Sequence, residues 1–293
     1  MFPPLAVLPQ YLFPKQALTA FAGWVAGHER DWVTTAIVRR FVRKYNVNMG
    51  EALDSNIASY ASFNDFFTRA LKPGARPVAQ ADLICPVDGA ISQFGPISGD
   101  QIFQAKGHRY STTALVGGDA KLAEQFKDGS FATLYLSPKD YHRIHMPCDG
   151  RLTQMIYVPG DLFSVNPTTA RGVPGLFARN ERVVCVFESK RGPFVLVLVG
   201  ATIVGSMATV WHGVVNPPRL PAVKTWRYVD SGADQKVELK QGDEMGRFLL
   251  GSTVVMLFPK APSARPALQF NPAWQPTQAI RLGESMANYQ EPT

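Results

Sequence analysis

The sequence contains few cysteines. Only Cys85, Cys148 and Cys185 occur among its 293 residues, and no two of them form a C-x-x-C pair. An odd number of widely spaced cysteines argues against a disulfide framework or a structural zinc site, and favours a reducing compartment. We therefore expect these side chains to act as small buried hydrophobic groups rather than as catalytic thiols.

Long apolar runs are missing as well. The longest, residues 194–205, is rich in valine and interrupted by glycine, which indicates a buried strand. It is shorter than the roughly 20 residues that cross about 30 Å of hydrocarbon. No basic region precedes the apolar residues near the N-terminus. We therefore expect neither a transmembrane helix nor a cleaved signal peptide.

Acidic residues are outnumbered. Lys and Arg total 30 against 23 Asp and Glu, which gives a formal charge of +7 and a pI near 9.4. Such a charge fits nucleic acid, anionic lipid, an acidic substrate or no specific partner. Nucleic acid is the least favoured, because no Lys/Arg run with interleaved aromatic residues occurs in the later part of the chain. Hydrophobic residues make up 46%, enough for a sizeable core in one large or two small domains.

The first 72 residues differ in texture from the rest. Four prolines keep the start irregular, and helical patterns then cover residues 16–27 and about 31–45. In the second pattern Arg39 and Arg43 lie opposite an apolar side, which consists of Val33, Ile37, Val38, Phe41, Val42 and Tyr45. This layout is typical of a helix at a membrane interface, and also of an ordinary helix packed on a core. The apolar, proline-rich residues ahead of it favour the membrane.

A short helix and a β-rich region follow. The helix is expected over residues 64–71, with Ser62 or Asn64 as its cap and Pro73-Gly74 as its stop. Short Val/Ile/Leu/Phe runs between turn residues predict strands at 83–94, 130–136, 150–158, 182–188, 193–199, 202–210 and 248–258. The tail after Pro259 is expected to be a loop that ends in a short helix.

These patterns predict an α+β fold. A helical, membrane-associating region, 1–72, would precede a β-rich catalytic domain, 73–293. The β-rich part would be a sandwich or a barrel, comparable to the barrel-sandwich folds of lipoyl-carrier domains.

Three features carry candidate chemistry, and each is weak by itself. His142 and His145 lie three residues apart after a predicted strand, and because a lone histidine pair more often has another role, a metal site is not favoured. Ser252 follows a glycine inside a strand-like stretch, which could equally be a strand with a bulge. Asp88 precedes a glycine in what could be a simple β-turn.

Together, Asp88, His145 and Ser252 supply the groups of a serine-based triad. A serine hydroxyl is a poor nucleophile until a base such as histidine takes its proton, and a carboxylate can stabilise the resulting imidazolium. A serine hydrolase is the routine interpretation, but the chain lacks a G-x-S-x-G motif.

The sequence resembles the proenzymes of bacterial, pyruvoyl-dependent phosphatidylserine decarboxylases. The matching segments run in family order and are residues 62–69, 85–89, 104–108, 135–147, 157–160, 163–166 and 250–253. The Leu-Gly-Ser-Thr sequence at 250–253 is short, but its combination with Asp88 and the two histidines is specific. The helical N-terminal region also resembles the membrane-associating segment of that family.

This resemblance implies self-cleavage between Gly251 and Ser252, which gives a β chain, 1–251, and an α chain, 252–293. Ser252 would attack the Gly251 carbonyl with His145 as base and Asp88 orienting it, and would become a covalent pyruvoyl group. That carbonyl would form a Schiff base with the substrate amine and act as the electron sink of decarboxylation. His142 would donate the proton that replaces carbon dioxide. No metal and no pyridoxal phosphate would be needed.

The resemblance also implies where the protein works and what it contacts. The substrate would be phosphatidylserine and the product phosphatidylethanolamine, made for phospholipid biosynthesis. Candidate contacts to the substrate are Tyr141, which could also replace His142 as the acid, together with His108, Lys106, Arg179 and Arg182. The protein would lie peripherally on the anionic, cytoplasmic side of the inner membrane, as a dimer of processed αβ units, and would not bind nucleic acid.

Two other classes remain open from the residues alone. A serine hydrolase would keep an intact chain and react with serine-directed acylating reagents. A membrane-peripheral binding module without catalysis would tolerate loss of the Ser252 hydroxyl. Chain cleavage with a blocked new N-terminus distinguishes both from the decarboxylase.

Overall fold

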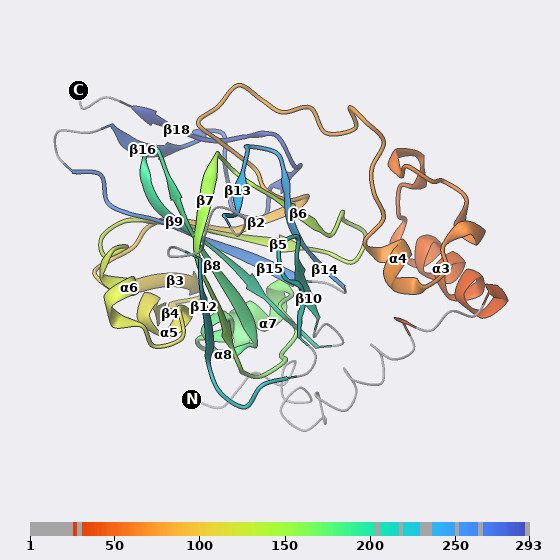
Figure 1. Cartoon of the computed structure of the whole chain (residues 1–293), viewed down its shortest axis with the longest axis horizontal. Coiled ribbons are helices and arrows are strands. Elements are labelled where there is room, and N and C mark those ends of the chain that lie inside the picture. The colour runs from red at the N-terminus through yellow and green to blue at the C-terminus, as the bar shows by residue number, and fades with distance from the viewer. Residues whose placement is uncertain are drawn as a thin grey trace.

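The computed structural model of the chain describes residues 26–27, 31–202, 206–216, 219–228, 236–249, 252–262 and 266–290. Within these residues a large antiparallel sheet dominates the molecule (Figure 1). At its centre, β15 (Ser252–Phe258) lies between β9 (Gly192–Val199) and β5 (Ser130–Leu136), and all seven of its residues are buried. A strand buried on both faces reads as a continuous apolar run, which is why this stretch is so hydrophobic.

The remaining strands of this sheet extend on both sides of β15. The strand order is β12 (Lys224–Arg227), β7 (Gly150–Val158), β8 (Arg182–Ser189), β9, β15, β5, β2 (Gly89–Pro96) and β17 (Ala279–Ile280), with β13 (Glu238–Leu239) also paired to β7.

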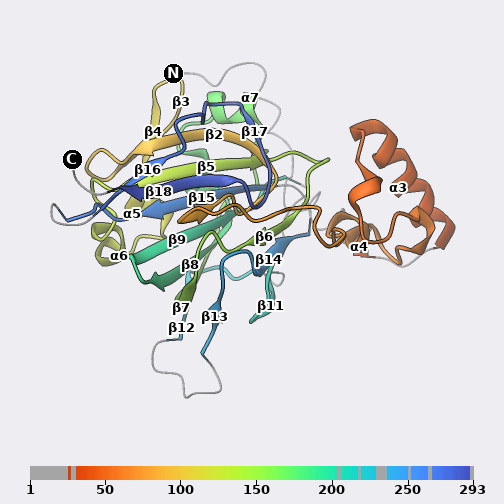
Figure 2. The same cartoon turned by 90° about the horizontal axis from the view of Figure 1, so that it is seen from above.

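The two faces of the sheet bury two separate cores. Val254 and Met256 point into one core and Val255 and Leu257 into the other, as alternation along a strand requires. The first core is covered by two smaller sheets, β11-β10-β14-β6 and β1-β18-β16 (Figure 2). Their strands are β11 (Gly213–Asn216), β10 (Met207–Thr209), β14 (Glu244–Phe248), β6 (Arg143–His145), β1 (Leu83–Ile84), β18 (Ser285–Gln290) and β16 (Ala267–Phe270).

Short helices and a hairpin cover the second core (Figure 1). These elements are α5 (Thr112–Leu115), α6 (Ala120–Glu124), α7 (Pro167–Gly172), α8 (Leu176–Arg179) and the β3–β4 hairpin (Gln101–Ala105 and His108–Ser111). Serine, aspartate and asparagine side chains cap α5, α6 and α7 by accepting backbone N–H bonds. Helices this short depend on packing against the sheet for their stability.

The N-terminal helices form a layer of their own beside the β-rich body (Figures 1 and 2). It contains α3 (Asp31–Tyr45), α4 (Phe63–Phe67) and the 3-10 turns η1 (Met49–Glu51) and η2 (Ile57–Ser59). The Phe41 ring of α3 contacts the rings of three phenylalanines in α4, and Val38 is fully buried beside them. The apolar side of α3 is therefore used mainly for packing, as in an ordinary core helix, while Trp32 at its start is 80% exposed.

The expected helix boundaries hold at α3 and fail at α4. The prediction for residues 31–45 is confirmed, whereas only Ala26 and Gly27 of the expected helix 16–27 lie within the described residues, and both are helical. Ser62 caps α4 as expected, in a capping box with Asp65. The helix ends at Phe67 rather than at residue 71, because Ala70 and Leu71 pair with residues 52 and 53 instead.

The α+β class is confirmed, and several details of the β prediction are wrong. Each sheet within the described residues is open, so a barrel is not formed there. The expected strand 83–94 is broken at residues 85–88, where the chain crosses from β1 to β2, and the stretch 248–258 is divided between β14 and β15. Within 202–210 only Met207–Thr209 is assigned as strand, and residues 203–205 lie outside the described part.

The tail differs most from expectation. Instead of a loop and a helix it forms β16, β17 and β18, and β18 lies between β1 and β16 with Met286 and Ala287 buried. Among the described residues, no helix is long and apolar enough to cross a membrane.

Candidate active site

Ser252 is the first residue of the central strand. Its register partner is Leu136 at the end of β5, and by alternation its side chain faces the first core. The residue is 1% exposed, and its Oγ has no hydrogen-bond partner among the described residues. A buried hydroxyl without a partner costs about 1–3 kcal/mol, so Ser252 lowers the stability of the folded chain at this position.

His142 lies beside the segment that leads to Ser252. Its carbonyl accepts the backbone N–H of Phe248 at 3.0 Å. Phe248 precedes Ser252 by four positions, a span of at most roughly 14 Å. The His142 ring packs on Phe67, with centroids 4.1 Å apart.

The protonation of His142 follows from its contacts. Nδ1 lies 2.8 Å from the carbonyl of Asp140, so it donates, and Nε2 carries the lone pair of the neutral ring. This Nε2 is buried without a partner. Burial lowers the pKa of His142 to about 3, and the bond to Asp140 offsets only part of that effect. His142 is thus a neutral base in the uncleaved chain.

His145 forms a second neutral imidazole. Its Nδ1 donates to the carbonyl of Gly242 at 2.7 Å, and its Nε2 accepts the hydroxyl of Tyr141 at 3.1 Å. Burial holds the pKa of His145 below its usual value. Burial also raises the pKa of Tyr141 to about 12, so its phenol stays protonated and remains a donor.

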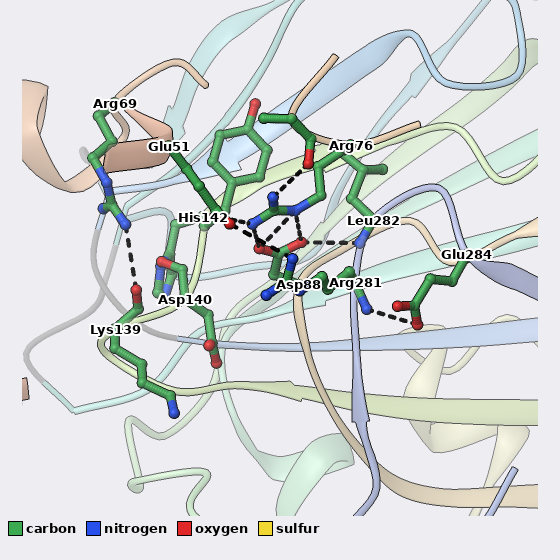
Figure 3. A network of polar contacts seen from close by, with 12 residues as sticks. Glu51, Arg69, Arg76, Asp88, Lys139, Asp140, His142, Arg281, Leu282 and Glu284 are labelled. Carbon is green, nitrogen blue, oxygen red and sulfur yellow. Dashed lines mark hydrogen bonds and ion pairs between the residues drawn. The ribbon is translucent and has the colours of Figure 1, made fainter. Parts of the chain in front are cut away.

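Asp88 is held by an arginine rather than by a histidine. Arg76 donates from Nε to both carboxylate oxygens at 2.9 and 3.1 Å and from Nη2 to Oδ2 at 2.6 Å. The N–H of Leu282 donates to Oδ1 at 2.9 Å. Arg76 Nη2 also bonds Glu51 at 2.8 Å, which links the N-terminal layer to this network (Figure 3). The hydrogen bond to Asp88 raises the pKa of Arg76.

The three residues of the expected triad therefore lie on neighbouring elements without forming one chain of hydrogen bonds. The backbone N–H of His145 bonds the carbonyl of Pro86, which brings it near the Asp88 turn. Within the described residues, however, no side-chain hydrogen bond joins Asp88 to His145 or His145 to Ser252. Gly251 lies outside the described part of the chain.

A cavity of about 700 Å³ has Asp88 in its lining, whereas Ser252, His142 and His145 are not lining residues. Its wall includes Asp88, Asp140 and Tyr141, and the lining segment from Ser137 to Tyr141 connects the register partner of Ser252 to His142. Six cationic side chains line it: Arg69, Arg76, Lys106, Lys139, Arg171 and Arg281. Three carboxylates, Glu51, Asp88 and Asp140, oppose them.

The other candidate contact residues are spread over the molecule. Lys106 lines the cavity, while the half-buried His108 lies next to it in the β3–β4 hairpin and is not part of the lining. Arg179 pairs with Asp161 at 3.2 Å. Arg182 is buried and donates to the carbonyls of Ala114, Leu115 and Asn180. A guanidinium used in this way holds α5 against the large sheet and is not available to a ligand.

Sequence reasoning missed Arg76, Glu51 and Arg69. Arg76 sits in an ordinary Pro-Gly turn region, and only folding brings it to Asp88, so no local pattern could have found it. Arg69 is different, because it ends the segment 62–69 on which the family resemblance rests. A basic residue at the end of an aromatic, buried helix was the available signal.

The three cysteines are not candidates for catalysis. Cys85 and Cys185 are buried and Cys148 is largely buried, all three as free thiols. Burial raises the pKa of all three thiols, that of Cys148 to about 12, so none is a reactive thiolate at neutral pH. Within the described part of the chain, no group of three or more His, Cys, Asp or Glu could hold a metal ion.

A buried serine at the start of the central strand, two neutral histidines on neighbouring segments and a cationic cavity are the features of a candidate enzyme site in a β-rich body. Comparison with known proteins identifies the family. The profile described as phosphatidylserine decarboxylase matches residues 63–288, and a second profile, described as PSD, matches residues 5–46.

Curated relatives agree over nearly the whole chain. The phosphatidylserine decarboxylase proenzyme of Polaromonas naphthalenivorans (strain CJ2) is 78% identical over 284 residues, which cover 97% of this chain and 96% of the relative. The proteins of the same name from Variovorax paradoxus (strain S110) and Dechloromonas aromatica (strain RCB) are 78% and 71% identical, over 97% of this chain and 97% and 98% of their own lengths. The chain therefore belongs to the phosphatidylserine decarboxylase family of enzymes.

Proposed function

We propose that this protein converts phosphatidylserine to phosphatidylethanolamine with a pyruvoyl group that it makes from Ser252 by cleaving itself. The observation that carries the proposal is the unpartnered, buried hydroxyl of Ser252 at the first position of the central strand. The word proenzyme in the names of the relatives describes proteins that are made as precursors, which supports processing here too.

Self-cleavage begins with attack of Ser252 Oγ on the carbonyl carbon of Gly251. The C–N bond breaks, the amine takes a proton, and an ester joins the two parts. Elimination across Cα–Cβ of Ser252 then breaks the ester. It releases residues 1–251 with a new carboxylate and leaves a dehydroalanine. Hydrolysis of that group takes up water, releases ammonia and leaves the pyruvoyl carbonyl.

His145 is the proposed base for this attack, and Asp88 its supporting carboxylate. For the proton transfer, Nε2 of His145 must exchange the hydroxyl of Tyr141 for that of Ser252. Being neutral, this nitrogen can accept the proton. The negative charge of Asp88 favours the imidazolium that results, and it raises the pKa of His145 slightly against the larger effect of burial.

Residues of the chain also fit the pyruvoyl group once it is made. Its electron-withdrawing carbonyl supplies the electron sink that loss of carbon dioxide requires. His142 Nε2, neutral and unpartnered in the uncleaved chain, is the proposed carrier of the proton to Cα, and the negative charge of a bound substrate would raise the pKa that burial lowers. The serine-derived group stays anchored because β15 remains paired to β5 and β9 after cleavage.

The exposed surface of α3 supports a location on the membrane. Trp32 and Ile37 are exposed there, and so are the basic residues Arg39, Arg40, Arg43 and Lys44. A basic residue near an anionic leaflet contributes about 1 kcal/mol of attraction. We propose that residues 1–72 hold the catalytic part, 73–293, peripherally on the cytoplasmic side of the inner membrane, as a dimer of αβ units.

Intact mass spectrometry of denatured protein tests the proposal. The wild type should give two chains whose masses sum to that of the precursor plus water minus ammonia, with the smaller chain beginning as pyruvoyl at position 252. Ser252→Ala should remain a single inactive chain, and His145→Ala should remain largely uncleaved. His142→Ala should be processed yet release carbon dioxide from phosphatidylserine at least about 100-fold more slowly, the typical contribution of a general acid or base.

Two results would contradict these assignments. A wild-type chain that stays intact through long incubation would lack the electrophile, and a serine hydrolase would then fit better. A fully processed His142→Ala enzyme with normal turnover would remove the proton-transfer role of that residue.

A further inference from the structure

Arg69 is a buried cation without an anionic partner. The residue is 5% exposed, and neither Nε nor Nη1 has an acceptor among the described residues. Its Nη2 makes one long bond of 3.3 Å to the carbonyl of Lys139, and the guanidinium stacks on the Phe66 ring. An unpaired buried charge is costly, and buried cations are normally paired with carboxylates. Burial accordingly lowers the pKa of Arg69.

The carboxylates around the cavity form no close ion pair with Arg69, and their attraction at longer range offsets only part of the effect of burial. Arg76 occupies Asp88 and Glu51 in close ion pairs. Asp140 Oδ2 accepts the N–H and hydroxyl of Ser137 instead. Among the described residues Arg69, Lys106, Lys139 and Arg171 form no ion pair, so this side of the cavity keeps an excess of positive charge.

The cationic side of the cavity lies close to His142. Arg69 and Lys139 lie on one side of His142 and Asp140, and the Arg76–Asp88 network lies on the other (Figure 3). The charge of Arg69 also contributes to the low pKa of His142, so the two side chains are electrostatic neighbours. The cavity wall from Ser137 to Tyr141 ends at the register partner of Ser252 on one side and at His142 on the other.

We propose that Arg69 is the buried anchor of a phosphate site, with Lys106, Lys139 and Arg171 around it, that holds the phosphodiester of the substrate. The inference rests on the proposed decarboxylase function and deepens it. A phosphodiester fits the site because its free oxygens carry negative charge and can accept from a guanidinium whose Nε and Nη1 have no acceptor among the described residues. The substrate carboxylate is a poorer occupant, since an ion pair to the leaving group would stabilise the ground state and slow its loss.

The test compares two soluble substrates on processed enzyme. Glycerophosphoserine carries the phosphodiester, while O-methylserine has the same amine and carboxylate without phosphate. In the wild type, kcat/KM should favour glycerophosphoserine, and Arg69→Met should reduce that preference by about 10- to 100-fold, as expected for loss of charge-assisted hydrogen bonds. Arg69→Lys should restore part of it. Arg171→Gln, at an exposed position, should reduce it less, and the surface variant Lys240→Gln should not change it.

A second readout distinguishes binding from a structural role. Methionine is shorter than arginine but keeps an unbranched apolar side chain, and it removes the desolvated charge, so Arg69→Met should cleave itself normally and melt no lower than the wild type. Lower melting with failed processing would make Arg69 structural and overturn the proposal. Unchanged preference would do so as well, and equal loss on both substrates would move the contact to the carboxylate. If the wild type formed no pyruvoyl and used neither substrate, the proposed function itself would fail.

Discussion

Buried polar groups in this molecule are of two kinds. Both carboxylate oxygens of Asp88 are paired, because Arg76 and the N–H of Leu282 supply four hydrogen bonds to them. Ser252 Oγ and His142 Nε2 are buried with no partner among the described residues. The first kind stabilises the native state and the second costs free energy. Chemistry is proposed for these two residues, whereas other buried groups without such a partner, for example the hydroxyls of Thr209 and Thr253, have no proposed role.

Substitution of Arg76 should cause a large loss of stability, because it breaks the ion pair with Asp88. Both side chains are less than 10% exposed, so Arg76→Gln leaves an uncompensated buried carboxylate. We expect the free energy of unfolding to fall by about 3–5 kcal/mol. Urea unfolding should be measured in the Ser252→Ala chain, so that only one polypeptide is present. The exposed pair of Lys240 with Asp149 provides the control, and Lys240→Gln should cost under about 1 kcal/mol. Equal losses of unfolding free energy in both variants would show that the buried pair contributes no more to stability than the exposed pair.

At the scale of elements, α3 combines two roles on one helix. Phe41 and Val38 pack on α4, whereas Trp32 and the basic residues face outward. The sequence pattern alone could not assign these roles, because the same apolar side suits a membrane or a protein neighbour. The packing on α4 leaves Trp32 as the exposed aromatic group available to a bilayer.

Trp32→Ala should therefore weaken membrane binding without destabilising the fold. Burying part of an indole is worth roughly 1.4 kcal/mol, which predicts about a tenfold loss of partitioning. Cosedimentation with vesicles of mixed neutral and anionic phospholipid measures it. Val78→Ala is the matched control, because Val78 is 52% exposed and lies outside the helical layer. Similar binding of both variants and the wild type would argue against α3 as the contact surface.

How much of the molecule the sequence predicts depends on the element. The strands β5, β7, β8 and β9 are predicted to within a residue at each end, because continuous apolar runs with clear turns leave few alternatives. The tail strands β16–β18 are missed, since their alternation is short and interrupted by Pro, Asn and Gln, and only tertiary pairing with β1 and β2 makes them strands. Local motifs likewise suggested Asp88, His142, His145 and Ser252 as site residues, and those roles stay predictions. The contacts of Arg76 and Arg69 join distant segments, so no local pattern predicted them.

At the scale of the whole molecule, two cores on opposite faces of one sheet make β15 the element shared by both. Cleavage before Ser252 would leave this strand paired on both sides, so the two chains should stay associated until the body unfolds. The stability of that body then governs the lifetime of the site, and it depends on pH through the buried neutral histidines.

Acid should destabilise the body through His142. Its pKa is about 3 in the folded chain and near 6.5 when exposed. The unfolded state therefore binds the proton more tightly, so this contribution to stability is complete above pH 6.5 and is lost as pH falls toward 3. Each pH unit within that window removes about 1.4 kcal/mol, or about 2 kcal/mol between pH 6.5 and 5. Urea unfolding should be measured for Ser252→Ala and for the double variant with His142→Gln. Between pH 6.5 and 5 the free energy of unfolding should fall by about 2 kcal/mol less in the double variant. Glutamine can still donate to the Asp140 carbonyl but does not titrate. Parallel losses in the two chains would mean that His142 does not titrate between the folded and unfolded states as its burial requires.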